Sequence, residues 1–229
     1  MSLDFSFFVP TFNSEKTVLD TIASIHEAVL SSEYSHEVVV VDDQSSDRTV
    51  KIVEEYAQVN STARVRILQN KRRSGLGYSF RKAVKIADGR FFKMVHSGNI
   101  ESADQIKKYL RHAGEADVIA TYIIDTRAWR RRWISSGVTA FMSVLSGYQL
   151  KYFQGSNLYF KKDILKYDTE NTGSFFLAEI LIDCLNRDKT FIELEWEQPR
   201  RDSKSHAISS RNLKSLAQCI VFVLKNRWR

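Results

Sequence analysis

The sequence predicts an α/β protein in which a mainly parallel sheet is flanked by helices. Strand-like and helix-like segments alternate through the first half of the 229 residues, as they do in doubly wound sheets. The run Val38–Val41 is apolar on both faces, which is typical of a strand buried in a parallel sheet. Ligands of such sheets bind beyond the carboxyl ends of the strands, so polar residues that follow a strand are candidate site residues.

Each element of the first half has its own signal. Phe5–Val9 is an apolar run closed by Pro10, which predicts a strand that ends in a turn. The segment Ser14–Ser31 places four aliphatic residues on one helical face, with Asn13 or Ser14 as its N-cap. By the same reasoning we expect strands at Val38–Val41, Arg64–Leu68 and Phe91–Val95, and helices at Asp47–Gln58 and Leu76–Ala87.

The second half is less regular. A predicted strand at Val118–Tyr122 precedes the cationic and aromatic cluster DTRAWRRRW, and a helical pattern then runs from Ile134 to Leu145. No linker-like or low-complexity stretch interrupts the chain, so we expect a single domain over residues 1–229. Further strands are predicted at Asn157–Phe160 and Phe191–Trp196, and helices at Phe175–Asn186 and Leu213–Leu224, the last of them amphipathic.

The composition indicates a soluble globular protein. Hydrophobic residues make up 43% of the chain, and no apolar run approaches the ~20 residues of a membrane span. The beginning of the chain has no basic region and carries Asp4, so we expect no signal peptide. The two cysteines, Cys184 and Cys219, make no disulfide framework. We therefore expect a reducing, cytoplasmic setting.

The positive charge is concentrated at the end of the chain. Pro199–Arg229 contains eight Lys or Arg residues and one Asp, which accounts for the whole net charge of +7. A segment of this sign suggests an anionic partner such as phosphate groups, a lipid surface or nucleic acid, unless it is simply a solvated surface. No nucleic-acid-binding motif accompanies it, so we expect no nucleic acid as a partner.

Two adjacent acids, Asp42 and Asp43, follow the buried strand Val38–Val41. Paired acids at a strand end can form a metal or phosphoacceptor site, as in receiver domains, but the later strand ends in MVHSGN without an Asp. They can also recognise a nucleotide, because a carboxylate accepts strong hydrogen bonds from ribose hydroxyls or a base N–H. A role limited to capping is the remaining alternative.

Three successive segments resemble the family 2 glycosyltransferases of GT-A fold: FFVPTFNSEKTV, VVVVDDQSSDRTV and NKRRSGLGYSFRKAVKIADGRFFKMV. The nearest subgroup is the polyprenol-phosphate (dolichol-phosphate mannose synthase-like) sugar transferases. The resemblance is strong over residues 5–112 and fainter to about residue 206. It implies a nucleotide-sugar-binding part over residues 1–112 and an acceptor-binding part over residues 113–229.

The resemblance also implies roles for individual residues. Asp42 would anchor the base or ribose with Asp43 supporting it, and Asp47 would cap the helix that it begins. The other residues implied at the nucleotide sugar are Pro10, Thr11, Asn13, Glu15, Arg72, Arg73, Gly75, Ser97 and Gly98. The two arginines would approach the donor phosphates, although exposed loop arginines are common.

The family's metal-binding D-x-D pair has no counterpart at the matching positions, which are His96, Ser97 and Gly98. A hard cation prefers oxygen ligands, so Mg²⁺ affinity is expected to suffer. His96 could ligate Mn²⁺, or it could contact a phosphate or water without any metal. Cationic side chains would then stabilise the leaving group, unless the chain binds a nucleotide sugar without turnover.

The acceptor side is implied more loosely. Glu179 matches the position of the general base of an inverting transfer, although an ionised phosphate acceptor needs no base and an ordinary solvated glutamate is the alternative. The segment QPRRDSKSHAISSR resembles the phosphate-binding loop of the lipid-phosphate subgroup. In one register Arg200, Ser203, Ser205 and His206 match that loop by spacing, and in another Ser203 and Lys204 match its Ser-Lys pair. With Arg201, these are the residues implied at the acceptor or its phosphate groups.

Membrane contact is a further expectation. The cluster WRRRW combines tryptophans with Arg130, Arg131 and Arg132, a composition suited to the interface of an anionic membrane; a core-facing helix with an incidental basic end is the alternative. The sequence thus predicts transfer of a sugar from a nucleotide diphosphate sugar to a polyprenyl phosphate, at the inner membrane face. A cytoplasmic transferase for surface polysaccharide and a non-catalytic nucleotide-sugar binder are the alternatives.

Overall fold

The computed structural model describes residues 3–30, 32–60, 63–124, 129–197 and 210–226, and within these ranges it leaves out the side chains of residues 129–132. Strands and helices alternate strictly through the first five strands. The first half contains β1 (Leu3–Thr11), α1 (Val18–Leu30), β2 (His36–Asp42), α2 (Thr49–Val59), β3 (Val65–Gln69), α3 (Leu76–Ile86), β4 (Gly89–Met94) and α4 (Ala103–Arg111). The second half contains β5 (Val118–Ile124), α5 (Trp129–Ser146), β6 (Leu158–Phe160), α6 (Lys161–Ile164), α7 (Phe176–Asn186), β7 (Phe191–Glu197) and α8 (Ser210–Asn226).

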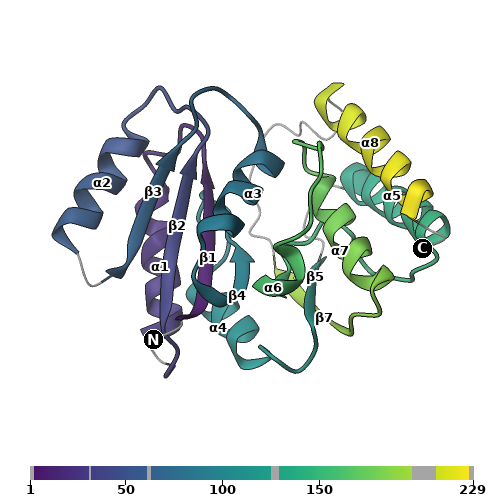
Figure 1. Ribbon diagram of the computed structural model, residues 1–229, viewed down its shortest axis with the longest axis horizontal. Helices are drawn as coiled ribbons and strands as arrows, with labels where there is room; N and C mark the ends of the chain where they lie inside the picture. Colours follow the sequence, from purple (N-terminus) through teal and green to yellow (C-terminus); the bar gives the residue numbers. More distant parts are fainter. Residues whose placement is uncertain (1–2, 31, 61–62, 125–128, 198–209, 227–229) are drawn as a thin grey trace.

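All seven of these strands belong to one sheet with the order β3-β2-β1-β4-β6-β5-β7 (Figure 1). Six strands run in one direction, and the short strand β6 is antiparallel to both of its neighbours, β4 and β5. The predicted mixed, mainly parallel α/β fold is therefore confirmed. Strands from both halves of the chain continue the same sheet, because β6 joins β4 to β5.

The four valines of β2 explain why this strand lies inside the sheet, between β3 and β1. All four are fully buried, but they face opposite layers: Val38 and Val40 pack toward α1, whereas Val39 and Val41 pack toward α3. Burying a valine side chain contributes about 1.5–3 kcal/mol. The double-sided apolar pattern thus requires helices on both faces, which is what the fold provides.

The helices form two layers. On one face, α1 packs against α2 and α4; on the other, α3, α6 and α7 cover the sheet. α8 packs on α7 and α5 at one end of the molecule, where Figure 1 shows α5 and α8 next to each other.

Several helices differ from the sequence predictions. α1 begins at Val18 instead of Ser14, because the chain first forms a turn in which the amide groups of Thr17 and Val18 donate to the Ser14 carbonyl. α5 begins at Trp129 instead of Ile134, so it includes the basic cluster. α4 was missed, although the Ser102 side chain at its N-cap accepts a hydrogen bond from the Gln105 amide, as an S-x-x-Q pattern predicts.

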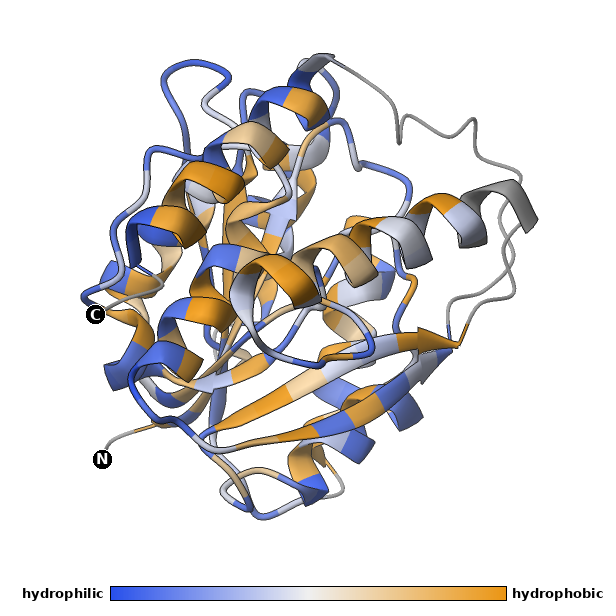
Figure 2. Ribbon diagram, turned by 90° about the vertical axis from the view of Figure 1, so that its right-hand side faces the viewer, coloured by the Kyte–Doolittle hydropathy of each residue, from blue (hydrophilic) through white to orange (hydrophobic). Residues whose placement is uncertain are grey.

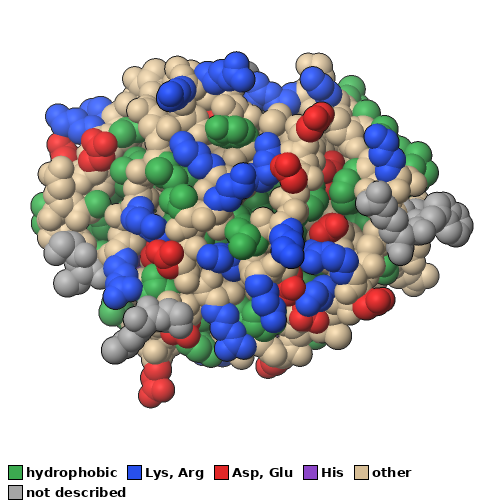
Figure 3. Space-filling model, in the orientation of Figure 1, with side chains coloured by type: hydrophobic (Ala, Val, Ile, Leu, Met, Phe, Trp, Pro, Cys, Tyr) green, Lys and Arg blue, Asp and Glu red, His purple; other side chains and the backbone are tan. Residues whose placement is uncertain are grey.

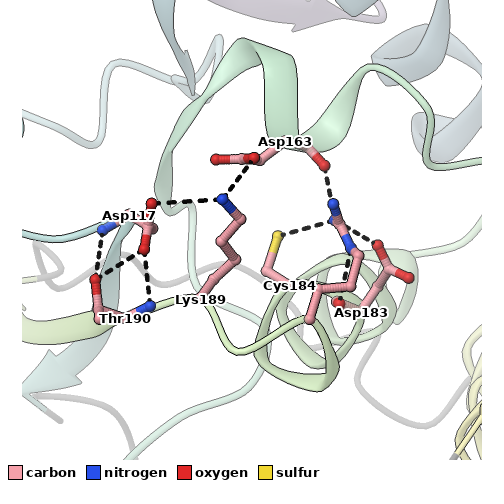
Figure 4. Close-up of polar contacts among 7 residues, drawn as sticks. Asp117, Asp163, Asp183, Cys184, Lys189 and Thr190 are labelled. Atoms are coloured by element: carbon pink, nitrogen blue, oxygen red, sulfur yellow. Dashed lines mark hydrogen bonds and ion pairs between the residues drawn. The ribbon is translucent and has the colours of Figure 1, made fainter. Parts of the chain in front are cut away.

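A polar network ties the amino ends of β5 and β7 to α6 (Figure 4). Lys189 forms ion pairs with Asp163 at 2.9 Å and with Asp117 at 3.6 Å. Asp117 also accepts hydrogen bonds from the amide and hydroxyl of Thr190. Hydrogen bonding with Asp163 raises the pKa of Lys189. This network lies at the opposite end of the strands from their carboxyl ends, and we regard it as structural.

A histidine pair lies between α1 and β2. His26 Nδ1 and His36 Nε2 are 2.7 Å apart, so at most one of these two nitrogens can carry a proton. Burial lowers the pKa of His26, and burial with the charges of His26 and Arg64 lowers the pKa of His36 to about 4. Between about pH 6.5 and pH 4 the unfolded chain therefore binds more protons than the folded chain, and stability should fall as the pH falls through this window.

We expect the thermal midpoint to decrease from pH 7 to pH 4.5, and to decrease less in a His36→Gln variant, which has no proton to gain at this position. Denaturation scans of both proteins at each pH measure the difference. Parallel pH curves for the two proteins would contradict this assignment.

Candidate functional site

The loops that follow β1, β2, β3 and β4 meet at the carboxyl edge of the sheet. Hydrogen bonds join these loops. The loop after β1 is joined to the loop after β2 and to the loop after β4, and the loop after β2 is joined to the loop after β3. The predicted nucleotide-binding residues are brought together there, as the parallel topology requires. They are Pro10, Thr11, Asn13, Glu15, Asp42, Asp43, Arg72, Arg73, Gly75, Ser97 and Gly98.

Asp42 lies beneath the surface of this edge. Its side chain is fully buried, and its carboxylate accepts hydrogen bonds from the Thr11 hydroxyl, from the hydroxyl and amide of Ser45, and from the Gln69 amide group. These donors use both carboxylate oxygens. Asp42 therefore holds the loop after β2 in place. This geometry does not favour the predicted direct contact of Asp42 with a base or ribose.

Asp43 directly follows Asp42 in the sequence, and the negative charge of its carboxylate is compensated by its own hydrogen-bond donors. It accepts hydrogen bonds from the amide of Ser74 at 2.7 Å, from the amide of Gly75 at 3.0 Å and from Asn70 Nδ2 at 3.0 Å. Ser74 and Gly75 directly precede α3, where a negative charge is favoured by the helix dipole. Backbone amides thus compensate the charge of Asp43, and the carboxylate fixes the loop that carries Arg72 and Arg73.

Gly75 is required by the local geometry. Its φ is 87°, and a Cβ atom at this position would lie 2.6 Å from the carbonyl oxygen of Thr172. Any other side chain would strain the backbone and push the two segments apart. The glycine thereby brings the start of α3 against the segment that precedes α7.

The first two loops are held together by reciprocal hydrogen bonds. Asn13 accepts one from the Ser46 amide, and Glu15 accepts one from the Arg48 amide. Asp47 accepts from the amides of Glu15 and Thr49. The expected capping role of Asp47 needs a correction, because the N-cap position of α2 is Arg48 and Asp47 precedes it.

Cationic side chains lie along the rim of this edge. Arg72 and Arg73 are exposed, and Arg73 Cζ lies 3.4 Å from the centre of the Phe12 ring, which belongs to the first loop. Figure 3 shows several Lys and Arg side chains along the upper edge of the molecule in the orientation of Figure 1. The rim can therefore attract an anionic group such as a diphosphate.

The end of β4 carries His96, Ser97 and Gly98. Ser97 is anchored to the first loop, because its carbonyl accepts from the Thr17 hydroxyl at 2.6 Å and its hydroxyl lies 3.0 Å from that of Ser14. The His96 ring stacks on Trp196, with centroids 6.2 Å apart. Burial lowers the pKa of His96, so the imidazole is neutral at neutral pH. Among the residues that the structure describes, no group of three or more His, Cys, Asp or Glu side chains could hold a metal ion.

A cavity of about 420 Å³ opens next to His96. Leu76 at the start of α3, Ser174 before α7 and Trp196 near the end of β7 contribute to its wall. α5 and the start of α8 close its other side. The cavity joins the nucleotide edge to the second half of the chain, and it offers space for a sugar or an acceptor group.

Sequence reasoning missed a buried ion pair close to this cavity. Lys93, in β4, is 1% exposed; its Nζ lies 3.1 Å from Glu101 Oε2, donates to the Ser156 carbonyl at 2.7 Å, and lies 4.0 Å from the centre of the Tyr109 ring. The signal was present, since a lysine within the apolar run RFFKMV cannot stay charged in a core without a partner.

Glu179 lies in a different place from the one expected. It is buried, which rules out a solvated surface position, and its carboxylate accepts hydrogen bonds from Tyr167, Thr169 and Asn171 at 2.6–2.7 Å. Burial raises the pKa of Tyr167, so its hydroxyl remains a donor. Glu179 lines a second cavity of about 440 Å³ beside α8, and not the cavity beside His96. This geometry does not favour Glu179 as the general base.

The remaining predicted residues lie outside the described residues. They are Arg200, Arg201, Ser203, Lys204, Ser205 and His206, together with the side chains of Arg130, Arg131 and Arg132.

Comparison with known proteins gives one family and several related enzymes. The sequence model of the family described as Glycosyl transferase family 2 matches residues 6–181. The chain is 33% identical over 103 residues to the UDP-Glc:alpha-D-GlcNAc-diphosphoundecaprenol beta-1,3-glucosyltransferase WfgD of Escherichia coli, covering 44% of this chain and 38% of that protein. It is 25% identical over 111 residues to the dolichyl-phosphate beta-glucosyltransferase of Dictyostelium discoideum, covering 46% of this chain and 33% of that protein. The match thus spans well under half of either relative's length.

Solved structures confirm the fold. Glucosyl-3-phosphoglycerate synthase from Mycobacterium tuberculosis, in complex with Mn²⁺, UDP-glucose and phosphoglyceric acid, superposes with a TM-score of 0.74 at 16% identity, covering 96% of this chain and 80% of that one. TarS from Staphylococcus aureus, in complex with UDP-GlcNAc, superposes with a TM-score of 0.63 at 19% identity, covering 97% of this chain and 67% of that one.

Proposed function

Because this chain belongs to glycosyl transferase family 2, we propose that it transfers a sugar from a nucleoside diphosphate sugar to an acceptor, and that the acceptor is a polyprenyl phosphate at an anionic membrane surface. The observation that carries the proposal is the meeting of four strand-end loops beside the cavity lined by His96. In this arrangement the diphosphate lies on the rim with Arg72 and Arg73, and the sugar reaches into the cavity.

The chemistry proposed is an inverting displacement. An acceptor oxygen attacks the anomeric carbon while the bond to the diphosphate breaks, and the two arginines stabilise the charge that develops on the leaving group. A phosphate acceptor is already ionised at neutral pH, so the reaction needs no general base. This fits the burial of Glu179 among three hydrogen-bond donors.

A glycan acceptor in surface polysaccharide synthesis is the second candidate. It is favoured by the similarity over 106 residues, at 34% identity, to a Staphylococcus aureus enzyme named as a poly(ribitol-phosphate) beta-N-acetylglucosaminyltransferase. The test is to supply each UDP-sugar and GDP-sugar with a short polyprenyl phosphate or with a glycan acceptor, and to follow both the glycosylated product and the released nucleotide. Donor binding without any product or hydrolysis would indicate a non-catalytic binding protein and would contradict the proposal.

Metal dependence should be weak, or shifted from Mg²⁺ toward Mn²⁺. The end of β4 offers one neutral imidazole and no carboxylate, and this donor set does not make a Mg²⁺ site. An imidazole is a better ligand for a transition metal. We expect EDTA to leave most nucleotide-sugar binding and turnover intact. Where EDTA lowers the activity, adding Mn²⁺ should restore more of that activity than adding Mg²⁺.

The variant His96→Asp with Gly98→Asp gives the matched comparison, because it restores two carboxylates at this position. It should increase Mg²⁺ affinity, provided that its thermal denaturation shows a folded protein. Activity of the unmodified protein that strictly requires Mg²⁺ would show that the metal ligands lie elsewhere in the chain.

A further inference from the structure

Two helices at one end of the molecule share an unusual composition. α5 has 18 residues and α8 has 17, and neither contains an Asp or Glu, although the chain has 27 acids in all. α8 carries Arg211, Lys214 and Lys225, and α5 begins with the three arginines of WRRRW. The two helices pack against each other, so the basic residues of both sequences belong to the same part of the molecule.

The same helices expose large apolar side chains to solvent. On α5, Trp133 is 74% exposed and Val144 is 78% exposed, and Phe141 lies between them at helical spacing. On α8, Leu213, Val221 and Leu224 are exposed. Figure 2 looks onto these two helices and shows hydrophobic positions along both of them. Exposed apolar residues at helical spacing with basic residues beside them are typical of a helix that lies on a membrane surface.

The position of this surface relative to the cavity has a functional consequence. Ile134, Ser135 and Val138 of α5, and Asn212 of α8, line the cavity beside His96. A lipid whose phosphate enters this cavity can therefore keep its chain in a bilayer against α5 and α8. None of the helices in the described ranges is both long and apolar enough to cross a membrane.

We propose that the exposed face of α5 and α8, here called the α5–α8 surface, docks on an anionic lipid bilayer. This inference rests on the proposed function, because an enzyme that uses a lipid acceptor has to reach that lipid at a membrane. The charge of the two helices selects the occupant: helices with basic residues and no Asp or Glu of their own are attracted to anionic headgroups.

The test uses vesicles of phosphatidylcholine, alone or mixed with phosphatidylglycerol. The unmodified protein should co-sediment with the mixed vesicles and be released as salt rises, because attraction is screened beyond a Debye length of ~8 Å at physiological salt. Val144→Asp and Leu224→Asp should each weaken binding about tenfold, since each removes an apolar contact and adds a repelled charge.

Two matched controls keep the result specific. Val59→Asp and Leu30→Asp place the same charge at positions that are 83% exposed on α2 and α1, away from the α5–α8 surface, and should bind vesicles like the unmodified protein. Equal binding to both kinds of vesicle, or equal losses in test and control variants, would overturn the proposal. So would a dimer that dissociates in Val144→Asp without any vesicle binding, because the surface would then join two copies of the chain.

A second measurement separates this inference from the proposed function. Val144→Asp should lose transfer to a long-chain acceptor embedded in vesicles while retaining transfer to a short acceptor in solution. Loss of both activities in a folded variant would contradict a purely docking role for this surface.

Discussion

Replacing Lys93 by methionine is expected to lower the free energy of unfolding by about 3–5 kcal/mol, the cost of removing one partner of a buried ion pair. The change leaves the Glu101 carboxylate buried without its cation, in a place where neither of its oxygens has another hydrogen-bond donor among the described residues. It also removes the hydrogen bond to Ser156. Urea denaturation of both proteins measures the difference.

A second variant distinguishes loss of the charge pair from a general packing defect. Glu101→Leu combined with Lys93→Met removes both charges, and such a double replacement is often neutral or stabilising. We therefore expect it to recover most of the stability that Lys93→Met loses. A double variant as unstable as the single one would show that the pair is not the source of the effect.

The second large effect is expected at the nucleotide edge. Asp42→Asn should weaken the binding of the nucleoside diphosphate sugar by about 1–3 kcal/mol, which is the scale of a charge-assisted hydrogen bond. The structure gives the reason: Asp42 holds Thr11 and Ser45, so the loop that shapes the site loses its anchor even if Asp42 never touches the ligand. Titration calorimetry on the folded variant measures the change.

Asp104→Asn is the matched control for this prediction. Asp104 is an exposed acid in the first turn of α4, and its replacement should leave the nucleotide affinity unchanged. An unchanged affinity in Asp42→Asn, with the fold intact, would remove Asp42 from the account of the site.

The sequence was most informative where one pattern has one physical cause. The four valines of β2 require burial on both faces, and the glycine at position 75 lies where only glycine fits. The convergence of the site loops followed from the parallel topology, because parallel strands end at the same edge. α4 was missed because its apolar face is small, although Ser102 and Gln105 form a capping pattern at its start.

Contacts between distant segments could not be predicted in this way. Which donors meet Asp42 and Asp43, and whether an acid such as Glu179 faces solvent or the core, depends on how loops from several elements pack. Lys93 and Glu101 are eight residues apart in sequence, but their pairing needs the turn after β4 and the packing of α4 on the sheet. Such long-range packing leaves only an indirect signal in the sequence.

Donor binding is the most direct test of the central claim that this chain uses a nucleoside diphosphate sugar. Thermal denaturation should be measured with each UDP-sugar and GDP-sugar, with and without Mn²⁺. A true donor at 100 times its Kd should add about 2.7 kcal/mol of stability, and this gain should shrink in Asp42→Asn but not in Asp104→Asn. If no nucleotide sugar raises the thermal midpoint, the site proposed at the carboxyl edge of the sheet is wrong. The same gain in Asp42→Asn as in the unmodified protein would remove Asp42 from that site.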